Sequence, residues 1–499
     1  MTTIDQLYRV EHWKYMAEGN ANVVLQYIGP DLRFRTTVLR VRKIARLSRR
    51  KTSASFITSQ FKDLADDPMA QKENLFTEPL FSSKIIGQLL GHEYVEQLVL
   101  ISLPTEFLKA LSEAIEPWRP SYRLHKGIDC SRSVGFLALD HTRFLKPSSS
   151  QPSIALEIKP KWGFISQSAF IPRNRDIKKR KCRFCMHQYY KLVSEQEANL
   201  SEYCPINLFS YEEALVQDAL EALVKTPQNN LRLFLDGVQQ SISKETMMHC
   251  LIGPDAEKLQ LTEAITGDEE ATLPVSLTDI VTQILIQSPL LRKLGRLQLA
   301  LDSLDVETVH RFYTQMVDPV TNTLPEPTFE EFLNTAEAFM YRVDMGEMMS
   351  HDQETFEAIN AASLGIEPDD VEDLEAIPAD LMLHFIREFL LSATLKDCSI
   401  LITVRRMENA EETPESKINP VTLRETYRSG GVTDNKIQFQ EHCRQIKVMG
   451  IDFIYKIACI DLDPKKMAAV PKYLNKDREI VDYYLAAVGD RNVKNCGSK

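Results

Sequence analysis

The pattern of apolar and polar positions predicts β-structure in the front part of the chain. Residues 12–28 (HWKYMAEGNANVVLQYI) read as two strands around a turn of small residues. Residues 36–43 (TTVLRVRK) alternate apolar and basic side chains, which is typical of a strand with one buried face. Residues 136–141 (FLALDH) form a short apolar run that ends in polar residues, and we expect a further strand there.

Helical patterns dominate beyond residues 145–153 (LKPSSSQPS), a Pro- and Ser-rich stretch that reads as an exposed linker. Apolar residues recur three and four apart in segments such as 211–225 and 380–395. Two strands return late, at 399–406 (SILITVRR) and 452–463 (DFIYKIACIDLD). We therefore predict an α+β fold with a β-rich N-lobe (1–150), a helix-rich C-lobe (151–485) and a disordered tail (486–499).

The composition is that of a globular protein, with 43% hydrophobic and 26% charged residues. No run of about 18 apolar residues predicts a membrane span, and the N-terminus is too polar for a signal peptide. Nine cysteines, an odd number, fit a reducing compartment better than a disulfide framework. We therefore expect an intracellular protein, in the cytoplasm or the nucleus.

Positive charge is concentrated in two segments of an acidic chain. The net charge of −11 argues against a general nucleic-acid binder. Yet residues 159–191 hold ten Lys or Arg and one acidic residue, and residues 40–51 hold seven basic residues and no acid. These clusters indicate a focused anion site; solvated surface is the alternative interpretation.

The stretch ALEIKPKWGF (155–164) places Glu157, Lys159 and Lys161 at alternate positions, which lie on one face of an extended segment. Three charges on an otherwise buried strand are costly unless a charged group meets them. Lysines beside a Glu suit contact with phosphate. The alternative is an edge strand in which Pro160 blocks pairing.

Three other segments carry candidate phosphate chemistry. Gly19 lies in a turn between two strands, where backbone N–H groups could cover nucleotide phosphates, and Arg40 on the next strand could reach them; a plain hairpin is the alternative. Asp397 lies at a helix-to-strand junction and Asp461 near a strand end, so one could accept a proton and the other hold Mg²⁺. Asp397 could instead only bound its strand. The segment TPQNNLRLFLDG (226–237) concentrates amide and guanidinium donors, although it also reads as a turn.

A cysteine pair suggests a metal. Cys182 and Cys185 have the C-x₂-C spacing and Cys204 follows 19 residues later, a weaker pattern than two such pairs. His187 could be a fourth ligand. On a helix it would instead share a face with Arg183 and Lys191, at positions i, i+4 and i+8.

Taken in order, these segments resemble the inositol-pentakisphosphate 2-kinase family, whose signature E-x-K-P-K motif is similar to EIKPK here. The likeness also runs through EGNANVVL, LRVRK, RFCMHQ, PQNN, KDCSI, IDLD and residues 465–473. It implies a two-lobed fold distantly like protein kinases, with ATP between the lobes and the inositol phosphate against the second lobe. The implied reaction is ATP- and Mg²⁺-dependent phosphorylation of the 2-hydroxyl of inositol 1,3,4,5,6-pentakisphosphate, which gives inositol hexakisphosphate (phytate).

The resemblance also implies a role for each matching residue. Asp397 would be the catalytic Asp and Lys159 would contact the transferring phosphate. ATP and its Mg²⁺ would meet Gly19, Asn20, Asn22, Arg40, Asp140, His141, Glu157, Arg232 and Asp461, the last as the Mg²⁺ ligand. The substrate would meet Arg123, Lys161, Arg183, His187, Lys191, Asn229, Asn230, Lys465 and Tyr473. Because His187 is then a substrate residue, Cys182, Cys185 and Cys204 are left as a separate candidate zinc site without a known fourth ligand, or as buried free thiols.

The expected partners are inositol pentakisphosphate and ATP, with no membrane, no nucleic acid and a monomeric state. One alternative is an inositol-phosphate-binding scaffold without catalysis; retention of Lys159, Asp397 and Asp461 disfavours it. The other is a kinase for another inositol polyphosphate, which the sequence leaves open.

Overall fold

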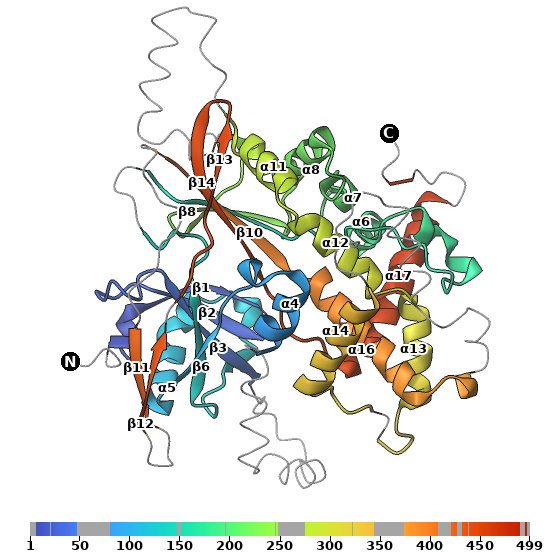
Figure 1. The fold of residues 1–499 in the computed structure, drawn as a ribbon, viewed down its shortest axis with the longest axis horizontal. Coiled ribbons are helices and arrows are strands. Elements are labelled where there is room, and N and C mark those ends of the chain that lie inside the picture. Colours follow the sequence, from blue (N-terminus) through green and yellow to red (C-terminus); the bar gives the residue numbers. More distant parts are fainter. Residues whose placement is uncertain are drawn as a thin grey trace, which may run out of the picture.

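The computed structural model describes residues 6–19, 21–46, 80–146, 151–194, 196–244, 246–247, 275–321, 323–343, 374–407, 421–426, 432–437, 439–489 and 495–496. These residues form a mixed α/β protein with two six-stranded antiparallel sheets and a separate two-stranded hairpin (Figure 1). Asn20, predicted to cover nucleotide phosphates, lies outside the described residues.

The first sheet has the strand order β1-β2-β3-β6-β4, and β5 pairs with β3. Its strands are β1 (Trp13–Glu18), β2 (Asn22–Tyr27), β3 (Thr37–Ala45), β4 (Val99–Ser102), β5 (Lys126–Ile128) and β6 (Val134–Leu139). Leu25, Leu39 and Leu137 are fully buried in a core that α5 (Thr105–Ile115) completes. The apolar positions read from the sequence thus become one packed face.

The second sheet has the order β13-β14-β10-β7-β8-β9. Its strands are β7 (Ile154–Ile158), β8 (Leu231–Leu235), β9 (Val238–Gln240), β10 (Ser399–Arg406), β13 (Arg444–Val448) and β14 (Ile451–Ile460); the hairpin is β11 (Val421–Thr426) with β12 (Val432–Ile437). All five residues of β7 are buried, as are seven of the eight residues of β10. Central strands covered on both faces carry near-continuous apolar runs, which explains SILITV in β10.

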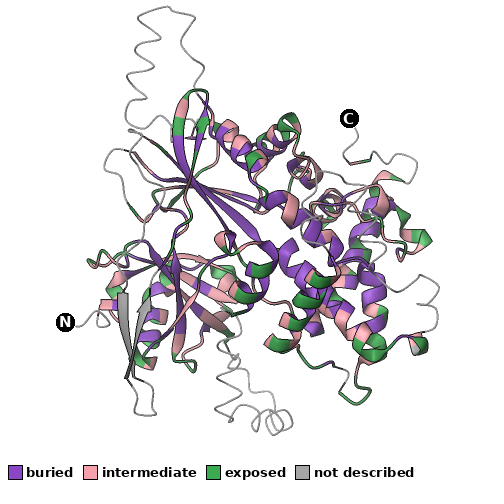
Figure 2. Ribbon diagram, viewed as in Figure 1, coloured by how far each residue is buried: buried purple, intermediate pink, exposed green. Residues whose placement is uncertain are grey.

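Most helices gather beside the second sheet and share one core with it (Figures 1 and 2). They are α4 (Gly87–Leu90), α6 (Arg183–Val193), α7 (Pro205–Leu208), α8 (Glu213–Lys225), α11 (Leu277–Gln287), α12 (Leu290–Ala300), α13 (Asp305–Met316), α14 (Phe329–Arg342), α16 (Ala379–Lys396) and α17 (Val470–Val488). Helix α16 is buried on nearly every side along its second half, as expected of a helix inside a core. Short 3₁₀- or π-helical segments connect these elements: η1 (Val10–His12), η2 (Phe81–Ile86), η3 (His92–Tyr94), η4 (Glu116–Trp118), η5 (Ser121–Arg123), η6 (Arg173–Lys179), η10 (Leu374–Ala376) and η11 (Met467–Ala469).

The predicted boundary at residue 150 falls between β6 of the first sheet and β7 of the second. Two segments nevertheless cross it. Residues 81–95 belong to the core of the second sheet, and Val95 bridges to Cys459 in β14. Conversely, Phe439 is buried in the core of the first sheet. Within the predicted tail, α17 extends to Val488, and the backbone N–H of Cys496 donates to the carbonyl of Arg180.

No helix in the described ranges is both long and apolar enough to cross a membrane.

Candidate active site

One edge of the second sheet collects the residues that the sequence singled out. Asp397 ends α16 two residues before β10, and Asp461 directly follows β14. Because Ser399 pairs with Ile460 in the antiparallel register, the two aspartates emerge from the same end of neighbouring strands. Strand register therefore brings together residues that are 64 positions apart.

The next two strands end at the same edge. Ile158, the last residue of β7, pairs with Leu231, the first residue of β8. Lys159 therefore leaves β7 beside the Asn229–Asn230 turn, and its backbone N–H donates to the carbonyl of Asn230 at 2.8 Å.

Ser399 links the two sides of this edge. Its hydroxyl lies 3.2 Å from a carboxylate oxygen of Glu157 and 3.3 Å from one of Asp461, and its single hydrogen can be donated to either. The other carboxylate oxygen of Glu157 accepts from Arg232 at 3.2 Å. Glu157, Arg232 and Asp461, all predicted nucleotide residues, thus form one hydrogen-bonded group.

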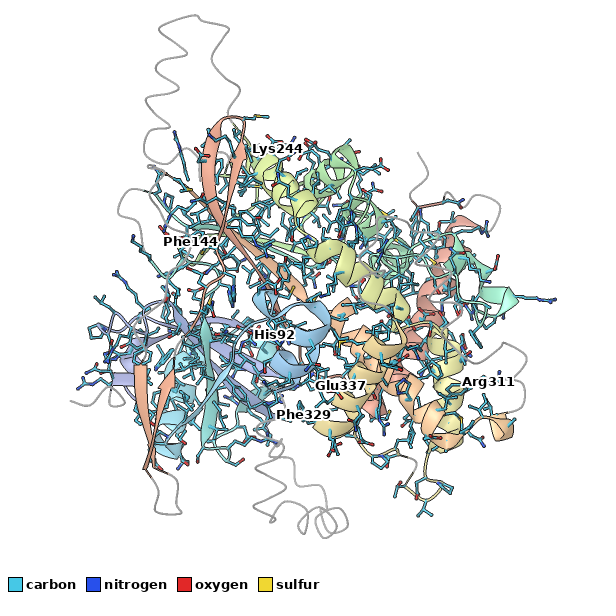
Figure 3. All side chains as sticks on the ribbon, viewed as in Figure 1. His92, Phe144, Lys244, Arg311, Phe329 and Glu337 are labelled. Carbon is cyan, nitrogen blue, oxygen red and sulfur yellow. The ribbon has the colours of Figure 1, made fainter. Side chains whose placement is uncertain are left out.

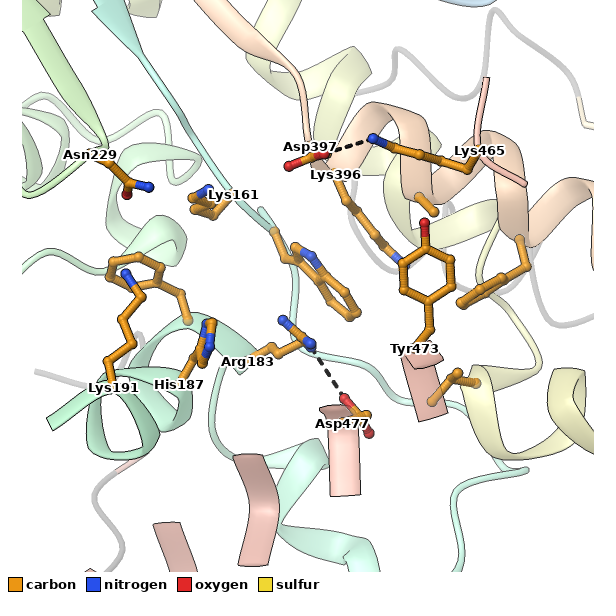
Figure 4. A pocket seen from close by; sticks show the side chains of 15 residues that line it. Lys161, Arg183, His187, Lys191, Asn229, Lys396, Asp397, Lys465, Tyr473 and Asp477 are labelled. Carbon is orange, nitrogen blue, oxygen red and sulfur yellow. Dashed lines mark hydrogen bonds and ion pairs between the residues drawn. The ribbon is translucent and has the colours of Figure 1, made fainter. Parts of the chain in front are cut away.

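A pocket of about 320 Å³ opens beside this edge (Figure 4). Eight of the predicted residues line it: Lys161, Arg183, His187, Lys191, Asn229, Asp397, Lys465 and Tyr473. They come from the loop after β7, from α6, from the turn before β8, from the junction between α16 and β10, from the loop after β14 and from α17. Arg183, His187 and Lys191 point from one face of α6, as the i, i+4, i+8 spacing predicts.

The pocket strongly perturbs two of these groups. Burial lowers the pKa of Lys161 to about 8; Asp397 opposes this change, while Lys159 and Lys191 reinforce it. Burial also lowers the pKa of His187 to about 3, with further lowering by Arg183 and Lys191. His187 is therefore neutral near pH 7, and its ring can take part in hydrogen bonds without carrying a charge.

Asp397 is held as a carboxylate by the surrounding lysines. Lys465 donates to it at 2.6 Å (Figure 4). Burial alone would raise the pKa of Asp397, but Lys465, Lys161 and Lys159 together lower it. An ionised carboxylate beside a cationic pocket can accept a proton from a bound hydroxyl.

Three cations brace the turn between β1 and β2. Lys43 donates to Glu18 at 2.6 Å and to the carbonyl of Gly19 at 2.5 Å. Arg119 binds Glu18 through two hydrogen bonds of 2.9 and 2.8 Å. Arg123, predicted to meet substrate, lies outside the pocket and donates to the carbonyl of Gly19 at 3.4 Å. The turn between β1 and β2 is therefore held by hydrogen bonds from all three cations.

Arg40 forms a buried ion pair with Glu96, from the segment after η3, at 2.8 Å. Burial lowers the pKa of Arg40, but the charges of Glu96, Asp461 and Asp463 more than offset this and raise it. Burial raises the pKa of Glu96 to about 7; Arg40 opposes the rise, and Asp461 and Asp463 add to it. Arg40 of the first sheet thus lies close to Asp461 and Asp463, which follow β14.

The segment that joins the two sheets carries Asp140 and His141. Asp140 accepts from Gln26 at 3.1 Å. Both ring nitrogens of His141 are buried without a hydrogen-bond partner among the described residues. Burial, with Lys456 and Arg40, places the pKa of His141 well below its ordinary value, so the ring is neutral. Such an unpaired neutral ring fits a ligand that supplies its own polar atoms.

Side chains from the second sheet hold this connecting segment. Thr403 donates to the carbonyl of His141, and Arg405 donates to the carbonyl of Lys146 at 2.7 Å. The ring of Phe144, labelled in Figure 3, lies 4.8 Å from the guanidinium of Arg405.

Two predicted asparagines have buried side-chain oxygens. Asn230 is 1% exposed and its amide donates to Gln228 at 3.4 Å, so only its backbone reaches the edge described above. Asn22 begins β2, and its buried Oδ1 has no partner in the described part of the chain.

The cysteine cluster is completed by the tail. Cys182, Cys185, Cys204 and Cys496 place their Sγ atoms within 4.8 Å of one another. A tetrahedron with Zn–S bonds of 2.3 Å has sulfur separations of about 3.8 Å, and the Cys182–Cys204 separation is 4.0 Å. His187 is not part of this group, so the fourth sulfur comes from Cys496.

Sequence reasoning missed the residues that act through partners. Glu96, Trp162, Lys396, Asp477 and Cys496 all belong to the sites above. Glu96 and Asp477 lie outside every motif quoted above, and although Trp162 and Lys396 lie within ALEIKPKWGF and KDCSI, their residue types alone did not indicate which groups they contact. Cys496 is the exception, because three clustered cysteines without a fourth ligand direct attention to the remaining ones.

Comparison with known proteins gives one family. The family model described as inositol-pentakisphosphate 2-kinase matches residues 15–479. The chain is 27% identical to the inositol-pentakisphosphate 2-kinase of Arabidopsis thaliana over 95% of this chain and 93% of that protein. It is 26% identical to that of Danio rerio, with the same coverage of each chain.

Proposed function

The chain belongs to the inositol-pentakisphosphate 2-kinase family, and from this premise we propose that it transfers the γ-phosphoryl group of ATP to the 2-hydroxyl of inositol 1,3,4,5,6-pentakisphosphate. The product is inositol hexakisphosphate. In this proposal the two sheets are the cores of two lobes distantly like those of protein kinases, with the nucleotide between them.

One observation carries the proposal: Asp397, Lys159 and Asp461 meet at one sheet edge, beside a pocket lined by Lys161, Arg183, Lys191 and Lys465. Inositol pentakisphosphate bears roughly ten negative charges if each phosphate carries nearly two. A pocket that draws cations from several distant segments suits such a ligand. The carboxylate at its rim suits the neutral hydroxyl that must lose a proton.

The nucleotide would lie between the braced β1–β2 turn and the edge of the second sheet. Gly19 and Asn22 would cover its phosphates, Arg40 would pair with them, and Asp140 and His141 would meet the adenine. Asp461 is an exposed carboxylate with Asp463 two residues on, and such hard oxygen donors suit Mg²⁺. Asp461 would hold this ion, which when bound neutralises charge on the phosphates.

In the chemical step, Asp397 would accept the proton of the 2-hydroxyl while the hydroxyl oxygen bonds to the γ-phosphorus. The bond from that phosphorus to the bridging oxygen of ADP breaks. Lys159 and Arg232 would neutralise the transferring group, and Glu157 positions Arg232 through the 3.2 Å hydrogen bond.

The test is incubation of the purified chain with ATP, Mg²⁺ and inositol pentakisphosphate, with the product identified by its phosphorylation pattern. Asp397→Asn should reduce turnover at least about a hundredfold, the usual contribution of a general base, with ATP binding retained. Asp452→Asn, at an exposed carboxylate in β14, is the matched control and should keep full turnover. Near-normal turnover of Asp397→Asn would refute its role, and absence of product from the wild type would refute the function.

We also propose that Cys182, Cys185, Cys204 and Cys496 hold a structural Zn²⁺. Hydrogen bonds from the other three thiols lower the pKa of Cys496, which favours the thiolate that zinc requires. Because Cys182 and Cys185 begin α6, the ion would tie the tail to the helix that carries Arg183.

Metal analysis of the purified protein should give one zinc per chain, and Cys496→Ser should lower this content. Cys130→Ser alters a half-buried thiol outside the cluster and should leave it unchanged. A wild-type protein free of zinc after preparation without chelators would overturn this assignment.

A further inference from the structure

A carboxylate lines the pocket that we assign to a polyanion, and this requires an explanation. Asp477 of α17 is one of the residues around the pocket. An uncompensated negative charge there would repel every phosphate. The residue is 4% exposed, and both of its oxygens are bonded to cations.

The two cations on Asp477 differ in position. Lys178 donates to one oxygen of Asp477 at 2.7 Å and also to Asp305 at 2.7 Å, and all three groups are buried. Arg183 donates to the other oxygen from Nε at 3.2 Å (Figure 4). Of the two cations, only Arg183 lines the pocket.

Trp162 contacts the same guanidinium. Cζ of Arg183 lies 4.8 Å from the centroid of the indole ring, and Nζ of Lys396 lies 4.0 Å from it. Lys396 is itself buried and paired with Asp302. The indole therefore holds a fixed cation and, with its remaining surface, orients Arg183.

The backbone on both sides of Trp162 is fixed too. The side chain of Gln298, fully buried in α12, accepts from the N–H of Gly163 at 2.8 Å and donates to the carbonyl of Lys161 at 3.1 Å. Lys161 has a φ of 64°, a conformation that needs such support. The indole is thus attached to a braced segment.

This arrangement leaves one part of Arg183 for a ligand. Its Nε is hydrogen-bonded to Asp477, and its guanidinium lies over the indole of Trp162. Neither Nη1 nor Nη2 donates to any residue that the structure describes. Three cations (Lys178, Lys396, Arg183) meet three carboxylates (Asp302, Asp305, Asp477), so the group adds no net charge to the pocket. Its contribution is orientation.

We propose that Asp477 and Trp162 are positioning residues that fix Arg183, so that its two terminal nitrogens bind one particular phosphate group of the inositol phosphate. The proposal rests on the proposed function only for the identity of the ligand. A preoriented guanidinium binds a phosphate with two parallel hydrogen bonds and loses little side-chain entropy. It therefore favours ligands that carry a phosphate at that ring position.

The experiment measures binding without ATP, by calorimetry, of inositol pentakisphosphate and of the tetrakisphosphates that each lack one of its phosphates. Arg183→Ala identifies the phosphate concerned, because the tetrakisphosphate that lacks it should bind wild type and this variant equally. Asp477→Asn and Trp162→Leu should weaken binding of the other ligands about tenfold, the usual cost of ordering a side chain on binding. Neither change should weaken binding of the tetrakisphosphate that lacks the phosphate bound by Arg183. Trp162→Phe keeps an aromatic ring and should recover most of the affinity.

The control is Asp482→Asn, on the same helix but 62% exposed and paired with Arg175, which should change nothing. Equal weakening of all ligands by Asp477→Asn and Trp162→Leu, or none, would overturn the proposal. If loss of ATP binding shows that Asp477→Asn does not fold, Trp162→Leu decides alone. A wild type that binds these ligands but makes no product refutes the proposed function and leaves this test intact; a wild type that binds none of them overturns the ligand assigned to Arg183.

Discussion

Replacement of Glu96 by Gln should make the stability of the folded protein less sensitive to rising pH. Glu96 is buried beside Arg40, with Asp461 and Asp463 close enough to act on its charge. Burial, reinforced by the two aspartates, raises its pKa from 4.5 to about 7 in the folded protein. The folded state therefore holds this proton more tightly than the unfolded chain does.

The sign follows from this difference in proton binding. Between pH 4.5 and 7 the unfolded chain releases the proton while the folded protein keeps it, so ionisation of Glu96 reduces stability as the pH rises. A tenfold change in proton affinity corresponds to about 1.4 kcal/mol. The pKa difference between 4.5 and about 7 therefore lowers the free energy of unfolding by about 3 kcal/mol in total. About 2 kcal/mol of it falls between pH 5.5 and pH 8. Glu96→Gln has no proton to lose and should lack this component.

The assay is urea unfolding of wild type and Glu96→Gln at pH 5.5 and pH 8, at constant ionic strength. The stability of the wild type relative to the variant should fall by about 2 kcal/mol between these values. Glu106→Gln alters an 85% exposed carboxylate on α5, and its difference from wild type should stay constant. A relative stability that is constant, or that rises with pH, would refute the reasoning. It would mean that the attraction of Arg40 offsets or outweighs the rise in the pKa of Glu96 that burial causes.

Three further predictions concern the other sites. Because the pKa of Lys161 is lowered to about 8, affinity for inositol pentakisphosphate should fall as the pH rises through that value, whereas Lys161→Arg should bind equally at pH 7 and 9; parallel pH profiles would contradict this. Arg119→Leu leaves Glu18 a buried carboxylate with Lys43 alone, so unfolding should cost about 3 kcal/mol less, and the KM for ATP should rise; unchanged urea and kinetic values would count against the brace. Treatment with a zinc chelator should lower the melting temperature of the wild type, and Cys496→Ser should show a smaller decrease, since less metal remains to be removed; equal decreases would argue against Cys496 as a ligand.

The sequence predicted the local structure and the chemically distinctive segments well. Residues 399–406 read as a strand and form β10, and the stretch 155–164 begins within β7 (Ile154–Ile158). Arg183, His187 and Lys191 share one face of α6, as their spacing predicts. The order of the motifs identified the family that the comparison with known proteins also gives. Periodicity and motif order are properties of neighbouring residues, so they can be read along the chain.

Tertiary structure decided which of these residues lie close together and which side chains are their hydrogen-bond and ion-pair partners. The register of β14, β10, β7 and β8 gathers their ends at one edge, and no local pattern contains that register. The exchange of residues 81–95 and Phe439 between the two cores likewise depends on packing that a boundary drawn at residue 150 does not contain.

The clearest example is charge. The sequence by itself determined that cations gather in residues 40–51 and 159–191, and from this we expected an anion site. It could not indicate that Asp477 holds Arg183, that Glu96 holds Arg40 or that Cys496 joins three distant cysteines. A buried charge needs its partner in space and at hydrogen-bond distance, whatever the separation along the chain. Folding alone supplies that proximity.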